Sequence, residues 1–299
     1  MKNDLVVYDV LDIPRTYLEI EVSSSGKMWK KFELNGRFMV LRPDMKIKEA
    51  VALCRLQHEN VLQLVDVMRK DGSFHGCLME YFPSQTLEKG KLVTFKLVNI
   101  LYGEDQENIS FGKLLRLTVE VSSAIFFIHE KKLSHRNIHP NSILCAGERI
   151  KICDLFLSKS DAHPPDGYRP EEVGSFGSSS RFFSQWQAVD MYSFAVTFFE
   201  CILREKPASF TRQIWRKKVR VVVNDLHHND ILCHTFNRCL DINAASRPRI
   251  EKIVQVLRTS DELSVEIKNE LKSMRKSSCA LEYSVDNSPT HKKWIQQVQ

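Results

Sequence analysis

Several features that would assign a function directly are missing from this sequence. It has no CxxC pair and no internal repeat. No uninterrupted apolar run approaches the length of about 20 residues that a membrane helix needs. Its eight cysteines lack metal-ligand spacing, and most stand inside apolar runs. Residues 1–5 do not begin a signal peptide, so we expect a soluble protein with reduced thiols, in the cytoplasm or the nucleus.

A strong charge of one sign is missing as well. Lysine and arginine number 43 against 37 acidic residues, and the formal net charge of +6 is spread along the chain. No nucleic-acid partner is therefore expected, and most of this charge is typical of solvated surface. One short basic cluster, residues 215–220, leaves open a phosphate-rich or acidic partner.

What the sequence does have is apolar material in regular patterns. Hydrophobic residues make up 43% of the 299 residues, which excludes disorder throughout and is enough for two packed lobes. Short runs bounded by turn residues predict strands, and runs spaced by three and four predict helices. The strands are expected at residues 16–22, 28–34, 37–41, 61–67 and 76–81, and the helices at 47–56, 114–128, 191–202, 250–257 and 262–274.

These patterns divide the chain into one α+β unit with two lobes and two loose ends. A small antiparallel sheet comes first, and a larger helical part follows it. The expected parts are an N-terminal extension (1–14), a strand-rich N-lobe (15–82), a helical C-lobe (83–260) and a C-terminal helix with a flexible tail (261–299).

A set of motifs in fixed order gives the chain a family resemblance. Residues 135–144, His-Arg-Asn-Ile-His-Pro-Asn-Ser-Ile-Leu, resemble the catalytic loop of protein kinases, and residues 153–156, Cys-Asp-Leu-Phe, follow at the right distance. The segment after helix αC, the start of helix αF and the late arginine motif are matched by residues 56–61, 189–194 and 246–248. Over residues 15–260 the chain is similar to tyrosine-kinase-like and tyrosine kinases, which implies a bilobal kinase-like fold.

The resemblance implies a degenerate nucleotide site. Arg42 replaces the third-strand lysine that contacts the phosphates, and we expect it to pair with Glu49 and stabilise αC. Glu21 stands at a glycine position of the phosphate-covering loop, where a carboxylate repels phosphate, although an ordinary β turn through Gly26 is an alternative. Val40 narrows the adenine slot, so weak or absent ATP binding is expected. The implied nucleotide positions are Gly26, Met28, Val40, Arg42, Glu49, Met79, Glu80, Phe82 and Leu144.

Several catalytic positions implied by the resemblance also carry residues that differ from those of the family. Asn137 stands where the family has its aspartate, and losing such a general base costs about 10² to 10⁴ in rate. Arg136 is kept, and His139 takes the place of the loop lysine. Asp154 is kept as a magnesium ligand, whereas Ser142 is a weak replacement for the second ligand, unless its neighbour at 141 substitutes for it.

Positions that hold the kinase fold together match better. They are His135, Leu53, Leu155, Glu171, Asp190 and Arg247. Glu171 and Arg247 are expected to form a buried ion pair. Ser158, Ser160 and Tyr168 lie on a short activation segment, where Arg136 could receive a phosphate; ordinary exposed hydroxyls are the alternative.

The substitutions predict a pseudokinase, a scaffold or allosteric module that acts in signalling by binding other proteins. The alternative from the enzyme class is a weak or atypical serine/threonine or tyrosine protein kinase that places MgATP with Arg42 and Asp154. A third reading keeps ATP binding without catalysis, so that the nucleotide rigidifies the lobes and shifts a partner equilibrium.

Overall fold

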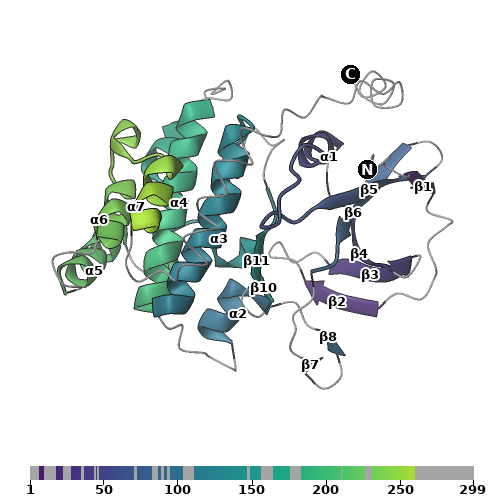
Figure 1. Cartoon of the computed structure of the whole chain (residues 1–299), viewed down its shortest axis with the longest axis horizontal. Helices are drawn as coiled ribbons and strands as arrows, with labels where there is room; N and C mark the ends of the chain where they lie inside the picture. The colour runs from purple at the N-terminus through teal and green to yellow at the C-terminus, as the bar shows by residue number, and fades with distance from the viewer. Residues whose placement is uncertain are drawn as a thin grey trace.

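A strand-rich part and a helical part lie side by side in the molecule (Figure 1). This arrangement confirms the α+β fold with a small N-lobe of strands and a larger C-lobe of helices. The computed structural model describes residues 7–9, 18–22, 28–34, 37–43, 45, 47–70, 73–82, 87–88, 91–92, 95–103, 111–146, 149–155, 164–175, 183–209, 211–225 and 231–259.

The N-lobe is built on a six-stranded sheet with the order β1-β5-β6-β4-β3-β2. Its neighbours are antiparallel, except that β1 runs parallel to β5. Strand β1 comes from the stretch that we expected to be an N-terminal extension. The strands are β1 (Val7–Asp9), β2 (Leu18–Val22), β3 (Met28–Leu34), β4 (Arg37–Arg42), β5 (Leu64–Lys70) and β6 (Ser73–Glu80), and helix α1 (Ile47–Leu53) follows β4.

The main differences from the expected N-lobe elements occur next to the C-lobe. Helix α1 ends at Leu53 rather than at 56, because tight-turn hydrogen bonds such as that from Leu56 N to Leu53 O replace the helical pattern. Strand β5 begins at Leu64 rather than at 61, because Val61 forms a bridge with Ile152 of the C-lobe. The chain between α1 and β5 is thus used to join the lobes.

The C-lobe consists of helices that pack around one buried helix. Helix α4 is buried on nearly all sides, as a helix that is apolar around its circumference should be. No helix in the described part of the chain has the length and apolar character needed to cross a membrane. The helices are α2 (Leu97–Tyr102), α3 (Phe111–Glu130), α4 (Phe183–Leu203), α5 (Arg212–Asp225), α6 (Ile231–Cys239) and α7 (Ile250–Thr259), with short 3-10 turns η2 (Pro140–Ser142), η3 (Glu171–Ser175), η4 (Pro207–Ser209) and η5 (Ala244–Ser246).

The predicted C-lobe helices at 114–128, 191–202 and 250–257 correspond to α3, α4 and α7. The predicted helix at 262–274 lies outside the described residues. The periodic pattern did not reveal the short strands β7 (Leu87–Glu88), β8 (Lys91–Leu92) and β9 (Phe95–Lys96). Strand β9 matters for the site because it pairs with β10 (Ile143–Ala146), which also pairs with β11 (Arg149–Ile152).

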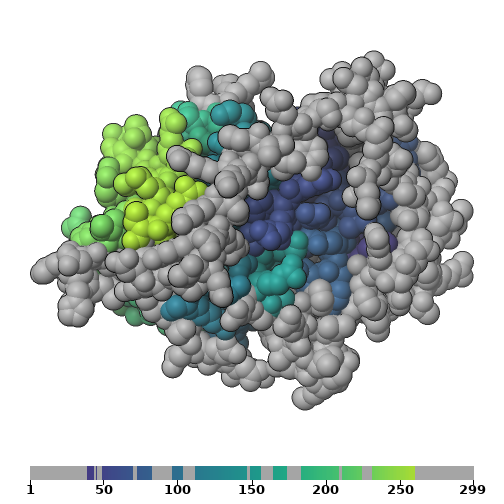
Figure 2. All heavy atoms as spheres, viewed as in Figure 1, coloured from purple at the N-terminus to yellow at the C-terminus, as the bar shows by residue number. Residues whose placement is uncertain are grey.

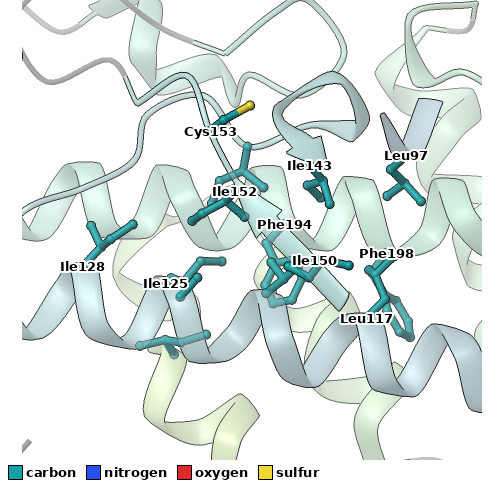
Figure 3. Close-up of a cluster of buried hydrophobic side chains, with 14 of the residues drawn as sticks. Leu97, Leu117, Ile125, Ile128, Ile143, Ile150, Ile152, Cys153, Phe194 and Phe198 are labelled. Carbon is teal, nitrogen blue, oxygen red and sulfur yellow. The ribbon is translucent and has the colours of Figure 1, made fainter. Parts of the chain in front are cut away.

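The small sheet of β9, β10 and β11 rests on the core of the C-lobe. Figure 3 shows Ile143, Ile150 and Ile152 of this sheet above Ile125 of α3 and Phe194 of α4. All five side chains are at most 4% exposed. This packing fixes the start of β10 and the end of β11, and the segments next to these two points carry the residues of the candidate site.

Backbone hydrogen bonds join the two lobes beside this sheet. Leu62 N donates to Ile152 O at 2.9 Å, and Ile152 N donates to Asn60 O at 2.8 Å. The Asn60 side chain is itself held by the buried Glu120 carboxylate of α3 at 3.0 Å. In Figure 2 the teal residues near 150 lie against the blue residues of the N-lobe. Residues after Ile152 therefore start from a fixed position between the lobes.

Candidate functional site

The candidate site forms where three segments meet between the lobes. The loop of residues 135–142 precedes β10, Asp154 follows β11, and Arg42 ends strand β4 of the N-lobe. The loop and Asp154 are positioned by the C-lobe core, while Arg42 is positioned by its pairing with Cys77 of β6. Movement of one lobe against the other would change the distance between Arg42 and Asp154.

Asp190 of α4 holds the loop of residues 135–142 by accepting hydrogen bonds from its backbone. Its Oδ2 accepts from His135 N at 2.8 Å and lies 2.9 Å from His129 Nε2, and its Oδ1 accepts from Arg136 N at 2.7 Å. Arg136 has a φ of 62°, which is uncommon for a residue other than glycine. The two bonds to the buried Asp190 carboxylate hold the backbone in this strained conformation.

Asn137 is hydrogen-bonded on both sides of its amide. Its Nδ2 donates to the carbonyl oxygen of Asp154 at 2.9 Å, and its Oδ1 lies 3.1 Å from His139 Nε2. The residue is 2% exposed. An amide has no basic site to take a proton from a hydroxyl, and here its oxygen already has a partner. Asn137 therefore fixes the backbone at Asp154 and does not present a proton acceptor.

His139 cannot supply the missing base. Burial lowers the pKa of His139 to about 4; the nearby His135 and Lys96 act in the same direction, and the Asp154 carboxylate acts against them. The imidazole is therefore neutral near pH 7. Its Nδ1 accepts from Asn141 N at 3.3 Å, so its proton is on Nε2, which donates to Asn137 Oδ1. Both ring nitrogens are engaged within the loop.

The Ser142 hydroxyl is hydrogen-bonded within the same loop. It donates to His139 O at 2.9 Å and accepts from His139 N at 3.1 Å, and it is fully buried. These contacts cap the short turn η2. Each would have to break before the oxygen could bind a metal ion.

Asp154 is held by Arg42. The distance from Arg42 Nη1 to Asp154 Oδ1 is 2.6 Å, and the two side chains are 11% and 5% exposed. The partner in this ion pair is the expected magnesium ligand, while the expected pair of Arg42 with Glu49, which is 8% exposed on α1, stays a prediction. No local sequence pattern indicates the pair of Arg42 with Asp154, because 112 residues separate the two partners.

The residues present do not fit a magnesium ion. Magnesium requires several oxygen ligands in near-octahedral geometry, but the Asp154 carboxylate is paired and the Asn137 and Ser142 oxygens are hydrogen-bonded. A divalent ion about 4 Å from a guanidinium is repelled by about 8 kcal/mol at an effective dielectric constant of about 20. Within the described residues, no group of three or more His, Cys, Asp and Glu side chains could hold a metal ion.

The positions expected to contact adenine belong to the hydrophobic core. Val40 and Met79 face each other across β4 and β6, and together with Phe82 and Leu144 they are at most 8% exposed. Glu80 accepts from Gln63 N at 2.8 Å and pairs with the buried Lys151 ammonium at 2.7 Å. The end of strand β6 is thus tied to β11. Gly26 lies outside the described residues, and only the backbone of Met28 and of Glu21 is described.

One buried cation was missed by the sequence reasoning. Lys96 of β9 is 5% exposed and pairs in register with Leu144 of β10. Burial raises the pKa of the Cys153 thiol well above its usual value, and the Lys96 charge opposes this shift. Lys96 therefore adds positive charge beside His139 and Cys153. A lysine next to an apolar run gave no indication that it would be buried.

The buried ion pair beneath the activation segment involves a different glutamate from the one expected. Arg247 binds Glu172 with two hydrogen bonds, of 2.5 and 3.1 Å, whereas Glu171 is exposed and pairs with Arg212. The prediction of a Glu171–Arg247 pair is therefore wrong by one residue. The cause is the short turn η3, which begins at Glu171 and turns the second glutamate inward.

The activation segment is held by a tyrosine that we considered for phosphorylation. Tyr168 Oη donates to Glu200 Oε2 of α4 at 2.5 Å, and Tyr102 Oη donates to Glu200 Oε1 at 2.9 Å. The Tyr168 hydroxyl is therefore engaged in a buried contact. The Arg136 guanidinium stacks over the Trp186 ring at 4.3 Å from the centroid. Ser158 and Ser160 lie outside the described residues.

The remaining structural positions, Leu53 and Leu155, are 5% and 7% exposed and belong to the same core as the loop. They join α1 and the segment after β11 to one another through the hydrophobic cluster. The parts of the site that position the backbone are therefore present, although the groups that would perform phosphoryl transfer are altered or engaged.

Comparisons with known proteins find similarity to protein kinases. The family model described as protein tyrosine and serine/threonine kinase matches residues 41–257. The chain is 24% identical to the serine/threonine/tyrosine-protein kinase HT1 of Arabidopsis thaliana, over 72% of this chain and 54% of that protein. It is 22% identical to receptor-interacting serine/threonine-protein kinase 1 of Homo sapiens, over 89% of this chain and 41% of that protein.

The chain spans about half or less of the length of these relatives, so the similarity concerns one domain of each. The matched residues 41–257 include Arg42, the loop of residues 135–142 and Asp154. Since the family model covers well over half of the sequence, this chain belongs to the protein tyrosine and serine/threonine kinase family.

Proposed function

We propose that this chain is a pseudokinase, a kinase-like module that acts by binding other proteins in signalling and does not transfer phosphate. The observation that carries the proposal is the state of Asn137, whose amide stands at the position of the family's base and is bonded to Asp154 O and to His139. Without a base at this point, phosphoryl transfer to the substrate hydroxyl is slower by about 10²- to 10⁴-fold.

The ion pair between Arg42 and Asp154 supports the same proposal. Phosphoryl transfer depends on magnesium ions that bridge the phosphates and neutralise their charge. Arg42 occupies the carboxylate that the family uses for this purpose, and Ser142 is closed by its contacts with His139. The chain has thereby replaced a metal site by an internal contact, which stabilises one arrangement of the lobes.

A scaffold function requires a rigid surface more than an open cleft. The buried contacts of Asp190, Arg247 and Glu200 hold the C-lobe loops in place. The buried cysteines of the C-lobe core, such as Cys145 and Cys201, are in keeping with a reducing compartment, and in this proposal the protein acts inside the cell. Its partners in this proposal are proteins, and ATP binds weakly or not at all.

The competing candidate is a weak protein kinase, which is favoured by the retained Asp154 and by the relatives that are named as kinases. The two candidates differ in turnover. Purified chain is incubated with labelled ATP, magnesium and either no substrate or a generic protein substrate, with Asp154→Ala as the control for contaminating kinases. We expect equal background incorporation for both proteins.

Incorporation by the unmodified chain that Asp154→Ala abolishes would reject the pseudokinase proposal. A thermal shift with ATP, measured with and without magnesium, completes the test. We expect no magnesium-dependent increase in melting temperature. An increase with ATP alone would support nucleotide binding without catalysis, and an increase that requires magnesium would contradict the closed metal site.

A further inference from the structure

The exposed apolar side chains of the molecule are concentrated in one region of the C-lobe. Of the five large hydrophobic residues that are exposed in the described part of the chain, four lie between residues 214 and 242. They are Ile214 (46%), Val221 (58%), Ile231 (61%) and Ile242 (65%). Exposed apolar residues that gather in one region indicate an interaction site more strongly than the same residues scattered singly.

Helix α5 presents two of these residues on one face. Its other face is buried through Trp215, Val219 and Val223, which are at most 4% exposed. Ile214 and Val221 are seven residues apart, so they stand two helical turns or about 10.5 Å from each other on the opposite side. Helix α5 lies at the end of the C-lobe far from the strands, which leaves this side open (Figure 1).

The same face carries positive charge that forms no ion pair with another described residue. The basic cluster of the sequence divides in the structure: Arg216 donates to Leu240 O at 2.8 Å and Lys218 pairs with Glu205 at 2.8 Å. Lys217 and Arg220 are exposed, and in the described part of the chain neither forms an ion pair. We call Ile214, Lys217, Arg220 and Val221 the α5 outer face.

We propose that the α5 outer face docks an acidic segment of a partner protein that presents two large apolar side chains about two helical turns apart. The apolar pair of the partner would cover Ile214 and Val221, and its carboxylates would lie against Lys217 and Arg220. This inference goes beyond the proposed pseudokinase function, because a catalytically active chain could use the same face.

Other polyanions fit this face less well. Recognition of an anionic membrane surface takes clusters of about four to eight lysines or arginines, and proteins that bind nucleic acid through its backbone make about six to ten phosphate contacts. The α5 outer face offers two cations, and the apolar residues on the other side of the helix are used in the core. A protein segment needs only a few charges, because apolar burial supplies most of its affinity.

The test selects peptides on the whole chain and then challenges them with variants. A random library of displayed 20-residue peptides is selected against the immobilised full-length protein. We expect the enriched peptides to be acidic and to contain two large apolar residues. Their dissociation constants are then measured by fluorescence anisotropy against Lys217→Glu/Arg220→Glu, against Ile214→Ser/Val221→Ser and against the control Arg249→Glu/Lys252→Glu.

The control changes the charge by the same amount at exposed residues beside and on α7. We expect each α5 variant to weaken binding about 10- to 100-fold, and the control to stay within about twofold, with all melting temperatures similar. Binding should also weaken as ionic strength rises. Phosphatidylserine vesicles and heparin serve as probes of membrane and polyanion binding.

Peptides that bind the α5 variants as well as the unmodified chain would overturn the proposal, as would enrichment of peptides without acidic residues or no enrichment at all. Loss of vesicle or heparin binding in the α5 variants, without any such loss for a peptide, would assign the face to a membrane or a polyanion instead. None of these outcomes depends on whether the chain transfers phosphate.

Discussion

Removal of the Arg42 guanidinium should destabilise the fold because it takes away the cation that lies against the buried Asp154 carboxylate. That carboxylate is 5% exposed and lies 2.6 Å from Arg42 Nη1. Breaking a buried ion pair on one side costs about 3 to 5 kcal/mol, and we expect the lower end for Arg42→Met because the arginine keeps some contact with water. A loss of about 3 kcal/mol lowers the melting temperature by about 6 to 12 °C in a domain of this size.

The single substitution also removes the other contacts of Arg42, so the pair is isolated with a double-mutant cycle. Asp154→Asn and the double variant Arg42→Met/Asp154→Asn complete the cycle, and urea unfolding gives the free energy of each protein. We expect a coupling energy of about 1 to 3 kcal/mol, since the second substitution removes the buried negative charge that has lost the Arg42 cation.

Two results would refute this reasoning. Free energies that add within about 0.5 kcal/mol would mean that the two side chains do not stabilise each other. A magnesium-dependent thermal shift in Arg42→Met alone would mean that the arginine was the only obstacle to a metal site. We expect no such shift, because Asn137 and Ser142 keep their hydrogen bonds within the loop.

Three further predictions concern buried carboxylates and the loop. Glu172→Gln should cost about 2 to 4 kcal/mol in urea unfolding and Glu171→Gln less than about 1, since only the former faces a buried arginine; equal losses would contradict the pairing. Burial raises the pKa of Glu200 to about 7, above its unfolded value, so stability present at low pH is lost as pH rises through 7. Relative to Glu200→Gln, the unmodified protein should lose about 2 to 3 kcal/mol between about pH 5 and pH 8, and parallel profiles would disprove this. Asn137→Asp should destabilise by about 1 to 3 kcal/mol, because a carboxylate cannot donate to Asp154 O, and should not create turnover with labelled ATP; a gain in either would contradict the role given to the amide.

The sequence was sufficient for the fold, and it indicated several segments that the structure brings together. Regular spacing located the long helices α3 and α4, whose apolar residues face a core on most sides. The order of the motifs placed Asn137, Asp154 and Asp190 in one region, which the structure brings together through the loop between α3 and β10. Such positions are fixed by local pattern and by the backbone.

The partners of charged side chains could not be predicted in the same way. Arg42 and Asp154 are 112 residues apart, and their contact depends on the relative position of the two lobes. The choice between Glu171 and Glu172 depends on one short turn, since adjacent residues of a turn point in different directions. The burial of Lys96 depends on β9, a strand of two residues without a periodic signal.

The distribution of the changes along the chain is an argument about function. Contacts that hold the loops, such as those of Asp190 and Arg247, are complete and buried. The substitutions relative to the family include positions that bind magnesium or accept a proton during phosphoryl transfer. Each substituted side chain, Asn137, His139 and Ser142, forms a hydrogen bond with another residue of the same loop. Leaving any of these three buried groups without a partner would cost about 1 to 3 kcal/mol. Their hydrogen bonds to one another and to Asp154 O therefore stabilise the loop as it stands, which supports the proposed pseudokinase function.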